Sequence, residues 1–155
     1  MSIGDELGFR KPVVVQSHEA LLNIYYTASC LKKKAAEFFR RYNLTDVQFN
    51  LMMLLAHQSG PEGGLSQARL SDMMLVNRAN ITSLIDRMEK ADLVVRTAAP
   101  GDRRYNIIKL TEHGRKMLDE ISPLYADEVK KAMAVLKENE QRKLIMMLEE
   151  VRTSL

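Results

Sequence analysis

The most regular pattern of apolar and polar positions is in the run that follows Asn77. Projected at 100° per residue, four apolar side chains fall on one narrow side of a helix: Ile81, Leu84, Ile85 and Met88. Asn77 is a favourable N-cap residue for such a helix. The pattern predicts an amphipathic helix whose apolar back packs against the rest of the protein.

The opposite side of this predicted helix is polar. It presents Ala79, Asn80, Ser83, Asp86, Arg87 and Lys90, with Thr82 on its flank and Arg78 at its N-terminal end. Short polar side chains with arginines suit a helix that sits in the DNA major groove, where donors must reach the edges of the bases. Taken alone, the same pattern fits a surface helix with a solvated polar face.

The neighbouring segments favour the first interpretation. Residues 66–74 form a second amphipathic pattern, and residues 75–77 leave only a tight connection, which is helix-turn-helix spacing. Residues 93–98 and 105–110 have strand character, and the Pro-Gly turn within 99–104 predicts a hairpin. Its basic loop contains Asp102, Arg103 and Arg104. The sequence therefore predicts a winged helix-turn-helix, in which a wing arginine reaches the adjacent minor groove.

The N-terminal third contains two further predicted helices. Residues 1–16 lack a sustained period and are expected to form an arm. A long helix is predicted from the N-cap Ser17 to about residue 42, with an apolar residue every three or four positions. Thr45 and Gln48 have capping-box spacing and predict a helix to about residue 58, followed by a Gly-rich connector at 59–64.

The C-terminal part predicts two more helices. Thr111 caps a helix that extends to about residue 136, and Pro123 is expected to kink it near residues 118–119. Asn139 is the expected cap of the last helix. The apolar faces of the first helix and these two exceed what a small lobe covers, so we expect them to form a homodimer interface. The alternative is that they pack only onto their own lobe.

Composition fits one ordinary globular domain. The chain has 155 residues, of which 46% are hydrophobic and 28% charged. The net charge of +3 divides into +1 for residues 1–65, +4 for residues 66–116 and −2 for residues 117–155. Positive charge is thus concentrated in the suspected DNA-binding segment.

No motif indicates catalysis. His18, His57 and His113 are far apart in the sequence and lack metal-ligand spacing, and there is no Gly-rich phosphate loop. We expect no enzyme activity, no cofactor and no metal. Without an apolar run of membrane-spanning length or a signal-peptide pattern, a cytoplasmic location with no membrane partner is expected.

Two smaller features have alternative explanations. Ser66 and Gln67 open the first motif helix, where they could contact a phosphate, but capping explains Ser66 equally well. Cys30 is the only cysteine, and Lys33 and Lys34 one turn away could activate its thiol. We favour a structural role over a redox role because free cysteines are usually buried.

Three segments also resemble the MarR family of bacterial and archaeal regulators: LTDVQFNLMMLLA, LSQARLSDMMLVNRANITSLIDRMEKADLVVR and PGDRRYNIIKLTEHGRKML. The resemblance covers about residues 44–118. Its most specific part is Asp102-Arg103-Arg104 followed by Leu110-Thr111-x-x-Gly114-Arg115. Asp92 is a departure, since the family usually has Gly at the end of the recognition helix. Asp tolerates the left-handed conformation better than most residues.

The resemblance implies a single MarR-like domain over residues 1–155. We expect an arm at 1–16, dimerisation helices at 17–44 and 117–155, and a winged helix-turn-helix lobe at 45–116. The fold class is mainly α with a small β-hairpin wing. The resemblance also implies a small effector, often an aromatic or phenolic anion, that releases DNA; the sequence identifies neither it nor the residues that bind it.

The predicted function is a homodimeric transcriptional regulator, most simply a repressor, that binds a pseudo-palindromic double-stranded DNA operator. The predicted DNA-binding residues are Ser66, Gln67, Arg78, Ala79, Asn80, Thr82, Ser83, Arg87, Asp102, Arg103 and Arg104. The alternative is a winged-helix module that binds another protein through the same helix front.

Overall fold

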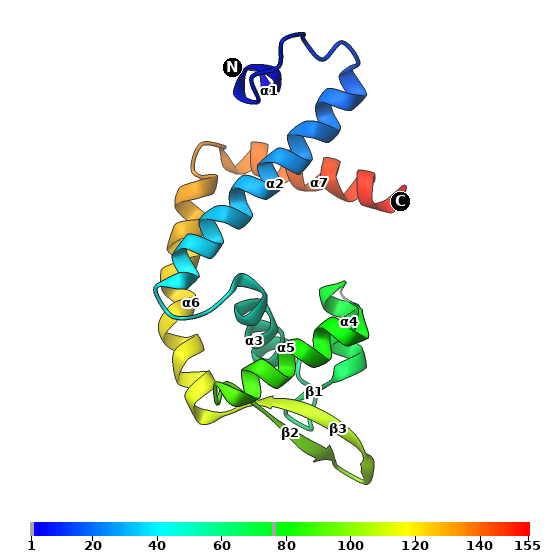
Figure 1. Cartoon of the computed structure of the whole chain (residues 1–155), viewed down its shortest axis with the longest axis vertical. Helices are drawn as coiled ribbons and strands as arrows, with labels where there is room; N and C mark the ends of the chain where they lie inside the picture. The colour runs from blue at the N-terminus through cyan, green and yellow to red at the C-terminus, as the bar shows by residue number, and fades with distance from the viewer. Residues whose placement is uncertain (1, 76) are drawn as a thin grey trace. The chain divides into compact units, whose positions relative to one another are not determined.

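The computed structural model describes residues 2–75 and 77–155; the side chains of Asp102, Arg103 and Arg104 lie outside what it describes. The chain divides into two compact units, Met1–Leu51 and Met52–Leu155, and the division falls within one helix. Figure 1 shows the elements: α1 (Ile3–Glu6), α2 (Gln16–Arg40), α3 (Asp46–Gln58), β1 (Leu65–Ser66), α4 (Gln67–Met74), α5 (Arg78–Lys90), β2 (Val94–Ala99), β3 (Asp102–Leu110), α6 (Glu112–Met133) and α7 (Glu138–Thr153). Within the described parts of the chain, no helix combines the length and the apolar character needed to cross a bilayer.

The first unit begins with a one-turn helix in the predicted arm. Ser2 caps α1: its hydroxyl accepts from the Asp5 N–H, and its own N–H donates to the Asp5 carboxylate at 2.9 Å. Ile3 is buried. The sequence did not predict this helix because a single turn has no period. The expected cap at Ser17 was also wrong, since Val15 is the N-cap of α2 and makes no side-chain cap bond.

A sharp corner joins α2 to α3. Asn43 takes a left-handed conformation with φ 55°, which asparagine tolerates well. On either side of the corner, the rings of Phe39 and Phe49 lie 4.6 Å apart between centroids. The predicted capping box is confirmed: the Thr45 N–H donates to Gln48 Oε1 at 2.9 Å, and the Gln48 N–H donates to Thr45 Oγ1 at 3.2 Å.

The second unit contains a three-stranded antiparallel sheet of order β1-β3-β2, not the two-stranded hairpin alone. Leu65 and Ser66 of β1 pair with Ile108 and Ile107 of β3. A Cβ on Gly64 would lie 2.5 Å from the Ile108 carbonyl oxygen, so glycine permits this close pairing. The sequence pattern did not predict β1, because a strand of two residues is too short to show an alternation of apolar and polar positions.

The β2–β3 hairpin is tighter than predicted. β3 begins at Asp102, three residues before the expected strand, and Ala99 pairs with Asp102 across Pro100 and Gly101. Gly101 has φ +83°, which favours glycine. The expected loop at 99–104 therefore contracts to a turn with a register shift after Ala98. The hairpin extends away from α4 and α5 as a ribbon (Figure 1).

The core of the second unit lies between α3, α4, α5, the sheet and the start of α6. Its fully buried side chains are Met52, Leu55, Leu70, Ile81, Ile85, Met88, Val94, Ile108 and Ile121. The four apolar positions predicted for the back of α5 are all buried. Two methionines, Met52 and Met88, are among these core side chains.

The start of α6 is fixed by two features. Thr111 is its N-cap, as predicted, and its hydroxyl accepts from the Gly114 N–H at 2.9 Å. A Cβ on Gly114 would lie 2.1 Å from the Leu93 carbonyl oxygen, so only glycine fits there. The helix continues on both sides of Pro123 and ends at Met133, earlier than residue 136. The kink at residues 118–119 stays a prediction.

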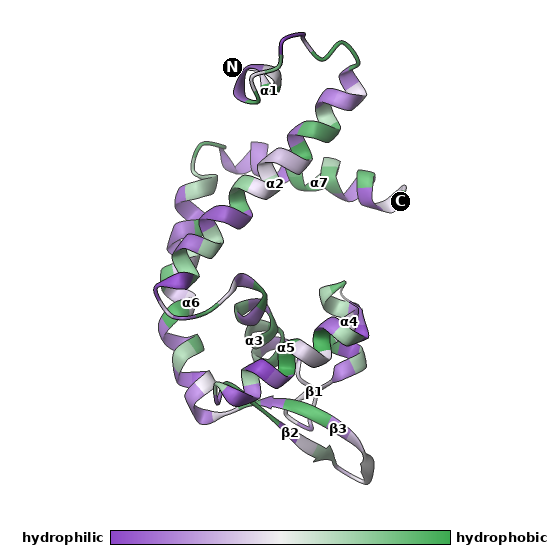
Figure 2. Ribbon diagram, viewed as in Figure 1, coloured by the Kyte–Doolittle hydropathy of each residue, from purple (hydrophilic) through white to green (hydrophobic). Residues whose placement is uncertain are grey.

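The last helix begins earlier than expected. Lys137 and not Asn139 is its N-cap, and the Lys137 N–H donates to Glu140 Oε2 at 2.7 Å. The Gln141 amide donates to the carbonyl oxygens of Met133 and Leu136 at 3.2 and 3.0 Å, which satisfies the C-terminal end of α6. No residue of α7 is buried. Figure 2 shows apolar and polar segments alternating along α7, and its apolar side chains Ile145, Met147 and Val151 are exposed.

Candidate nucleic-acid interface

The centre of the candidate interface is the exposed side of α5. Asn77 begins the helix as predicted, and its side-chain oxygen accepts from the Asn80 N–H at 2.8 Å. With the apolar back of the helix buried, the front is fixed in orientation by core packing. The structure leaves five predicted DNA-binding residues of this helix exposed: Arg78, Ala79, Asn80, Ser83 and Arg87.

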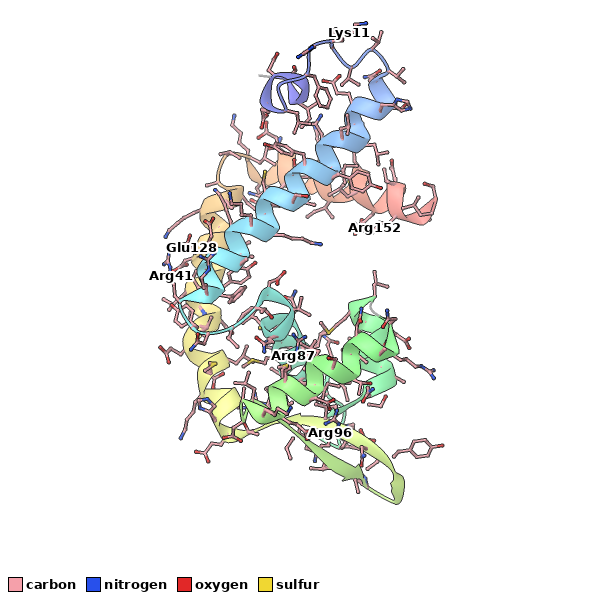
Figure 3. All side chains as sticks on the ribbon, viewed as in Figure 1. Lys11, Arg41, Arg87, Arg96, Glu128 and Arg152 are labelled. Atoms are coloured by element: carbon pink, nitrogen blue, oxygen red, sulfur yellow. The ribbon has the colours of Figure 1, made fainter. Side chains whose placement is uncertain are left out.

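Arg87 lies along its own helix. Its Nε donates to the Ser83 carbonyl oxygen at 3.3 Å, one turn back, and the side chain is exposed (Figure 3). The remaining N–H groups of a guanidinium have room for an acceptor outside the protein. The front of α5 thus offers two arginines together with amide and hydroxyl groups, which are the donors and acceptors that base edges and phosphates use.

The connection between α4 and α5 is as tight as the sequence predicted. Leu75 is the C-cap of α4 in a left-handed conformation, with φ 52° and ψ 41°. Val76 lies outside the described residues. Ser66 caps α4 by accepting from the Arg69 N–H at 3.1 Å, so its capping role is present. Its predicted phosphate contact stays a prediction.

Gln67 and Thr82 contact each other across the helix-turn-helix. The Gln67 amide donates to the Thr82 hydroxyl oxygen, and this hydroxyl donates to the Arg78 carbonyl oxygen at 2.8 Å. Thr82 is half-buried. The structure therefore brings these two predicted DNA-binding residues together as a link between α4 and α5. This pairing was not predicted, because the residues are far apart in sequence and neither has a diagnostic spacing.

Arg96 is the residue that the sequence analysis missed. It lies in β2, and its guanidinium binds Asp86 at 2.6 Å and Glu89, both on α5. Figure 3 shows it between the hairpin and α5. The charge pattern could have suggested that Asp86 and Glu89 bind a cation, because these two carboxylates stand one turn apart on a helix that also carries basic residues. Nothing in the sequence showed which of the nearby arginines would face them.

The C-terminal end of α5 follows the expectation for Asp92. This residue has φ 54°, the left-handed conformation that usually favours glycine. The Leu93 N–H then donates to the Met88 carbonyl oxygen at 2.9 Å, and the Thr111 hydroxyl donates to the Asp92 carbonyl oxygen. The turn therefore ties the end of α5 to the start of α6.

The predicted wing residues are Asp102, Arg103 and Arg104. Their backbone belongs to the first part of β3, next to the turn, and their side chains are outside the described set. The next residue, Tyr105, is exposed. The proposed DNA contacts of the wing thus rest on its place in the hairpin and on its charge.

Cys30 lies elsewhere, on α2, and is exposed. It raises the pKa of the neighbouring Tyr26, because a negative thiolate beside the phenol disfavours the phenolate; burial and Glu6 act in the same direction. The structural role that we favoured for this cysteine would require a second copy of the chain to cover it. Among the described side chains, no group of three or more His, Cys, Asp or Glu residues is placed to hold a metal ion.

Comparison with known proteins agrees with this geometry. A family model described as MarR family matches residues 42–104. The HTH-type transcriptional regulator MhqR of Bacillus subtilis is 31% identical over 111 residues, which is 72% of this chain and 74% of that protein. The HTH-type transcriptional regulator FarR of Neisseria gonorrhoeae is 29% identical and covers 90% of this chain and 92% of its own length.

Solved structures share the fold. AbsC, a MarR family transcriptional regulator from Streptomyces coelicolor, has a TM-score of 0.80 at 18% identity and covers 93% of this chain and 97% of its own. Sco3205, a MarR family transcriptional regulator from the same organism solved in complex with DNA, has a TM-score of 0.79 at 24% identity and covers 94% and 92%. The predicted fold class, mainly α with a small β-hairpin wing, is confirmed.

Proposed function

The chain belongs to the MarR family of transcriptional regulators, and from this premise we propose that it binds a pseudo-palindromic operator as a homodimer and regulates transcription. The observation that supports the proposal most directly is α5 itself. Its apolar back is fully packed, its front is exposed and polar, and a hairpin with two arginines next to its turn extends beside it.

The proposed division of the interface follows from chemistry. Asn80 and Ser83 have short side chains that form directional hydrogen bonds, which suits the reading of base edges. Arg78 and Arg87 can bind either a guanine edge or a phosphate. Arg103 and Arg104 would enter the minor groove or bind its phosphates, with Asp102 orienting one of them. Ala79 would contact a thymine methyl group.

We assign the first turn of α4 to contacts with the DNA backbone. Ser66 and Gln67 would contact a phosphate there, where N–H groups point outward. Thr82 would act with Gln67, because their hydrogen bond holds α4 against α5. Such contacts fix the register of the protein on DNA without specifying its sequence.

The homodimer places two copies of α5 on one duplex. Reading two half-sites about one helical turn apart multiplies modest half-site affinities. Support comes from the exposed apolar side chains of the terminal helices: Leu21, Ile24 and Leu31 on α2, and Ile145, Met147 and Val151 on α7. Such faces are expected to be covered by another chain.

Repression and release by a small effector form the regulatory part of the proposal. They are supported by membership in the family and by similarity to regulators such as the HTH-type transcriptional repressor NicR of Pseudomonas putida. The residues that would bind an effector are not assigned.

A DNA-binding measurement tests the proposal. The protein is titrated against duplex DNA from upstream of its own coding sequence, at several salt concentrations and with excess unrelated DNA. We expect a complex that survives the competitor and weakens steeply with salt, because cationic side chains displace counterions from phosphates. Absence of binding at low salt would refute it and favour a module that binds another protein.

A further inference from the structure

Arg96 connects the wing to the recognition helix at three points. Its guanidinium binds Asp86 Oδ1 at 2.6 Å and also the Glu89 carboxylate, and its backbone N–H donates to Glu89 Oε1 at 2.9 Å. Its side chain is 24% exposed, so water is partly excluded from the cluster. Figure 3 shows the residue beside α5 at the hairpin. Both the side chain and the backbone of one strand residue are therefore attached to α5.

The cluster differs from an ordinary surface ion pair. An exposed pair contributes little, because two flexible side chains lose entropy when they meet in water. Here one planar guanidinium bridges two carboxylates that stand one turn apart and would otherwise repel each other. Arginine forms such forked, directional bonds, and a lysine in its place would bind as a point charge without fixing an orientation. The cluster thus adds directional bonds between β2 and α5 to the apolar packing around Val94.

The distance between β2 and α5 matters because DNA fixes the separation of its grooves. If α5 lies in the major groove, the hairpin reaches the neighbouring minor groove only when the spacing between the two elements matches the duplex. Among the described residues, the hydrogen bonds and ion pairs between β2 and α5 all involve Arg96. Asp86 also belongs to the polar front of the helix, where an unpaired carboxylate would repel phosphates.

We propose that Arg96 is a positioning residue, which couples the wing to the recognition helix so that both grooves are bound together. This inference rests on the proposed function. Arg96 is not itself assigned a DNA contact, because its guanidinium is already committed to two carboxylates. Loss of the cluster would leave α5 folded and able to enter the major groove while the wing loses its fixed position.

The test compares Arg96→Met, Arg96→Lys and the triple variant D86N/E89Q/R96M with wild type. The triple variant removes the whole cluster with near-isosteric side chains, so no carboxylate is left unpaired. Two duplexes of equal length are used: one selected by the wild-type protein from a randomised pool, and one of unrelated sequence. Hydroxyl-radical footprints at saturating protein report the minor groove. Thermal unfolding and size-exclusion chromatography confirm that each variant is folded and of unchanged assembly.

We expect the triple variant to bind the selected duplex about tenfold more weakly than wild type. Its affinity for unrelated DNA should not fall, because the wing arginines remain and the three substitutions together raise the net charge by one. The protection of the flanking minor grooves should be lost in the triple variant and in Arg96→Met, and Arg96→Lys should not restore it. Lys131→Met removes an exposed cation paired with Glu128 at 2.8 Å on α6 and is the matched control; it should leave the footprint unchanged.

Three results would overturn the inference. One is a triple variant that keeps the affinity and the footprint of the wild-type protein. In that case Arg96 would only neutralise the charges of Asp86 and Glu89 and would not position the wing. Another is an equal loss on both duplexes with a salt slope lower by about one, which would make Arg96 a phosphate contact. The third is full rescue by lysine. Failure of the wild type to select any duplex would instead refute the proposed function, and the inference with it.

Discussion

Two residues of the candidate interface illustrate how specificity and affinity separate at the level of single side chains. Asn80 is exposed on the front of α5, and Arg104 adds a positive charge near the hairpin turn. An amide reads a base edge through two directional bonds, whereas a guanidinium near phosphates attracts every sequence alike.

Asn80→Ala is therefore expected to lose affinity mainly for the operator, by roughly 1–3 kcal/mol. Arg104→Ala should weaken binding to operator and random DNA alike and lower the salt slope by about one. Titrating both variants against both DNAs at several salt concentrations checks the assignment. If both substitutions reduced specific and non-specific binding in the same ratio, the two roles would be wrong.

Leu75 is a strained residue at the turn between α4 and α5. Its φ of 52° is in the left-handed region, which costs roughly 1–2 kcal/mol for a residue other than glycine. Its side chain is 93% exposed and thus gains almost nothing from burial in the chain. Asparagine adopts this conformation more easily and would remain exposed.

Leu75→Asn should raise the free energy of unfolding by about 0.5–1 kcal/mol and the Tm by a few degrees. Leu75→Ala is the matched control, since it removes the apolar side chain but leaves the backbone strain. Urea and thermal unfolding of the three proteins give the answer. Equal stability of the Asn and Ala variants would show that the backbone conformation of Leu75 does not limit stability.

At the level of elements, the close approach of α6 to the end of the recognition helix depends on Gly114. Glycine within a helix is normally unfavourable by about 1 kcal/mol relative to alanine, so Gly114→Ala should stabilise an isolated helix. In the folded chain, however, the new Cβ would lie 2.1 Å from the Leu93 carbonyl oxygen. The contact is with backbone, so the turn at Leu93 and the start of α6 must separate.

We expect Gly114→Ala to lower the free energy of unfolding by at least about 2 kcal/mol, because overpacking against backbone outweighs helix propensity. Ala126→Gly, at an exposed position of the same helix, should cost only about 1 kcal/mol and is the control for propensity. Chemical unfolding measures both. A stabilised Gly114→Ala protein would contradict the tight packing of α6 on Leu93.

The elements also show which parts of the fold the sequence could predict. Amphipathic spacing located the helices because burial of one face leaves a periodic trace, and the back of α5 was predicted residue by residue. Caps at Thr45, Asn77 and Thr111 were correct because each forms a local bond to a residue three positions later.

Features without a local signature were missed. Val15 and Lys137 begin helices with no side-chain cap bond, so the nearby Ser17 and Asn139 were more plausible caps from sequence alone. The pairing of β1 with β3 and the Arg96 cluster join residues that are distant in sequence or lie on different elements. The front of α5 was predictable, but what holds the wing beside it was not.

At the scale of the whole molecule, the proposed homodimer needs a surface that joins two copies of the chain. The helix α7 buries none of its residues within the single chain. At 100° per residue, its apolar residues Leu144, Leu148 and Val151 form one stripe, and Met147 flanks this stripe. Met146 points to the opposite, polar side of the helix. The two neighbouring methionines are almost equally exposed, at 59% for Met146 and 56% for Met147.

These methionines provide a matched pair of variants for the proposed homodimer. Met147→Glu would place a carboxylate inside an apolar interface, where it has no partner and must lose its hydration. We expect it to shift the protein toward monomer by at least about tenfold in dimer dissociation constant, and to weaken operator binding, because a monomer reads only one half-site. Met146→Glu makes the same chemical change on the polar side and should remain dimeric and bind as wild type does.

Analytical ultracentrifugation over a range of protein concentrations, combined with operator titration, measures both effects; far-UV circular dichroism confirms that the helices persist. A dimer weakened by Met146→Glu and unaffected by Met147→Glu would show that the opposite side of α7 meets the second copy. If neither variant altered a dimeric wild-type protein, α7 would lie outside the interface, and the exposed side chains of α2 would become the next candidates for it.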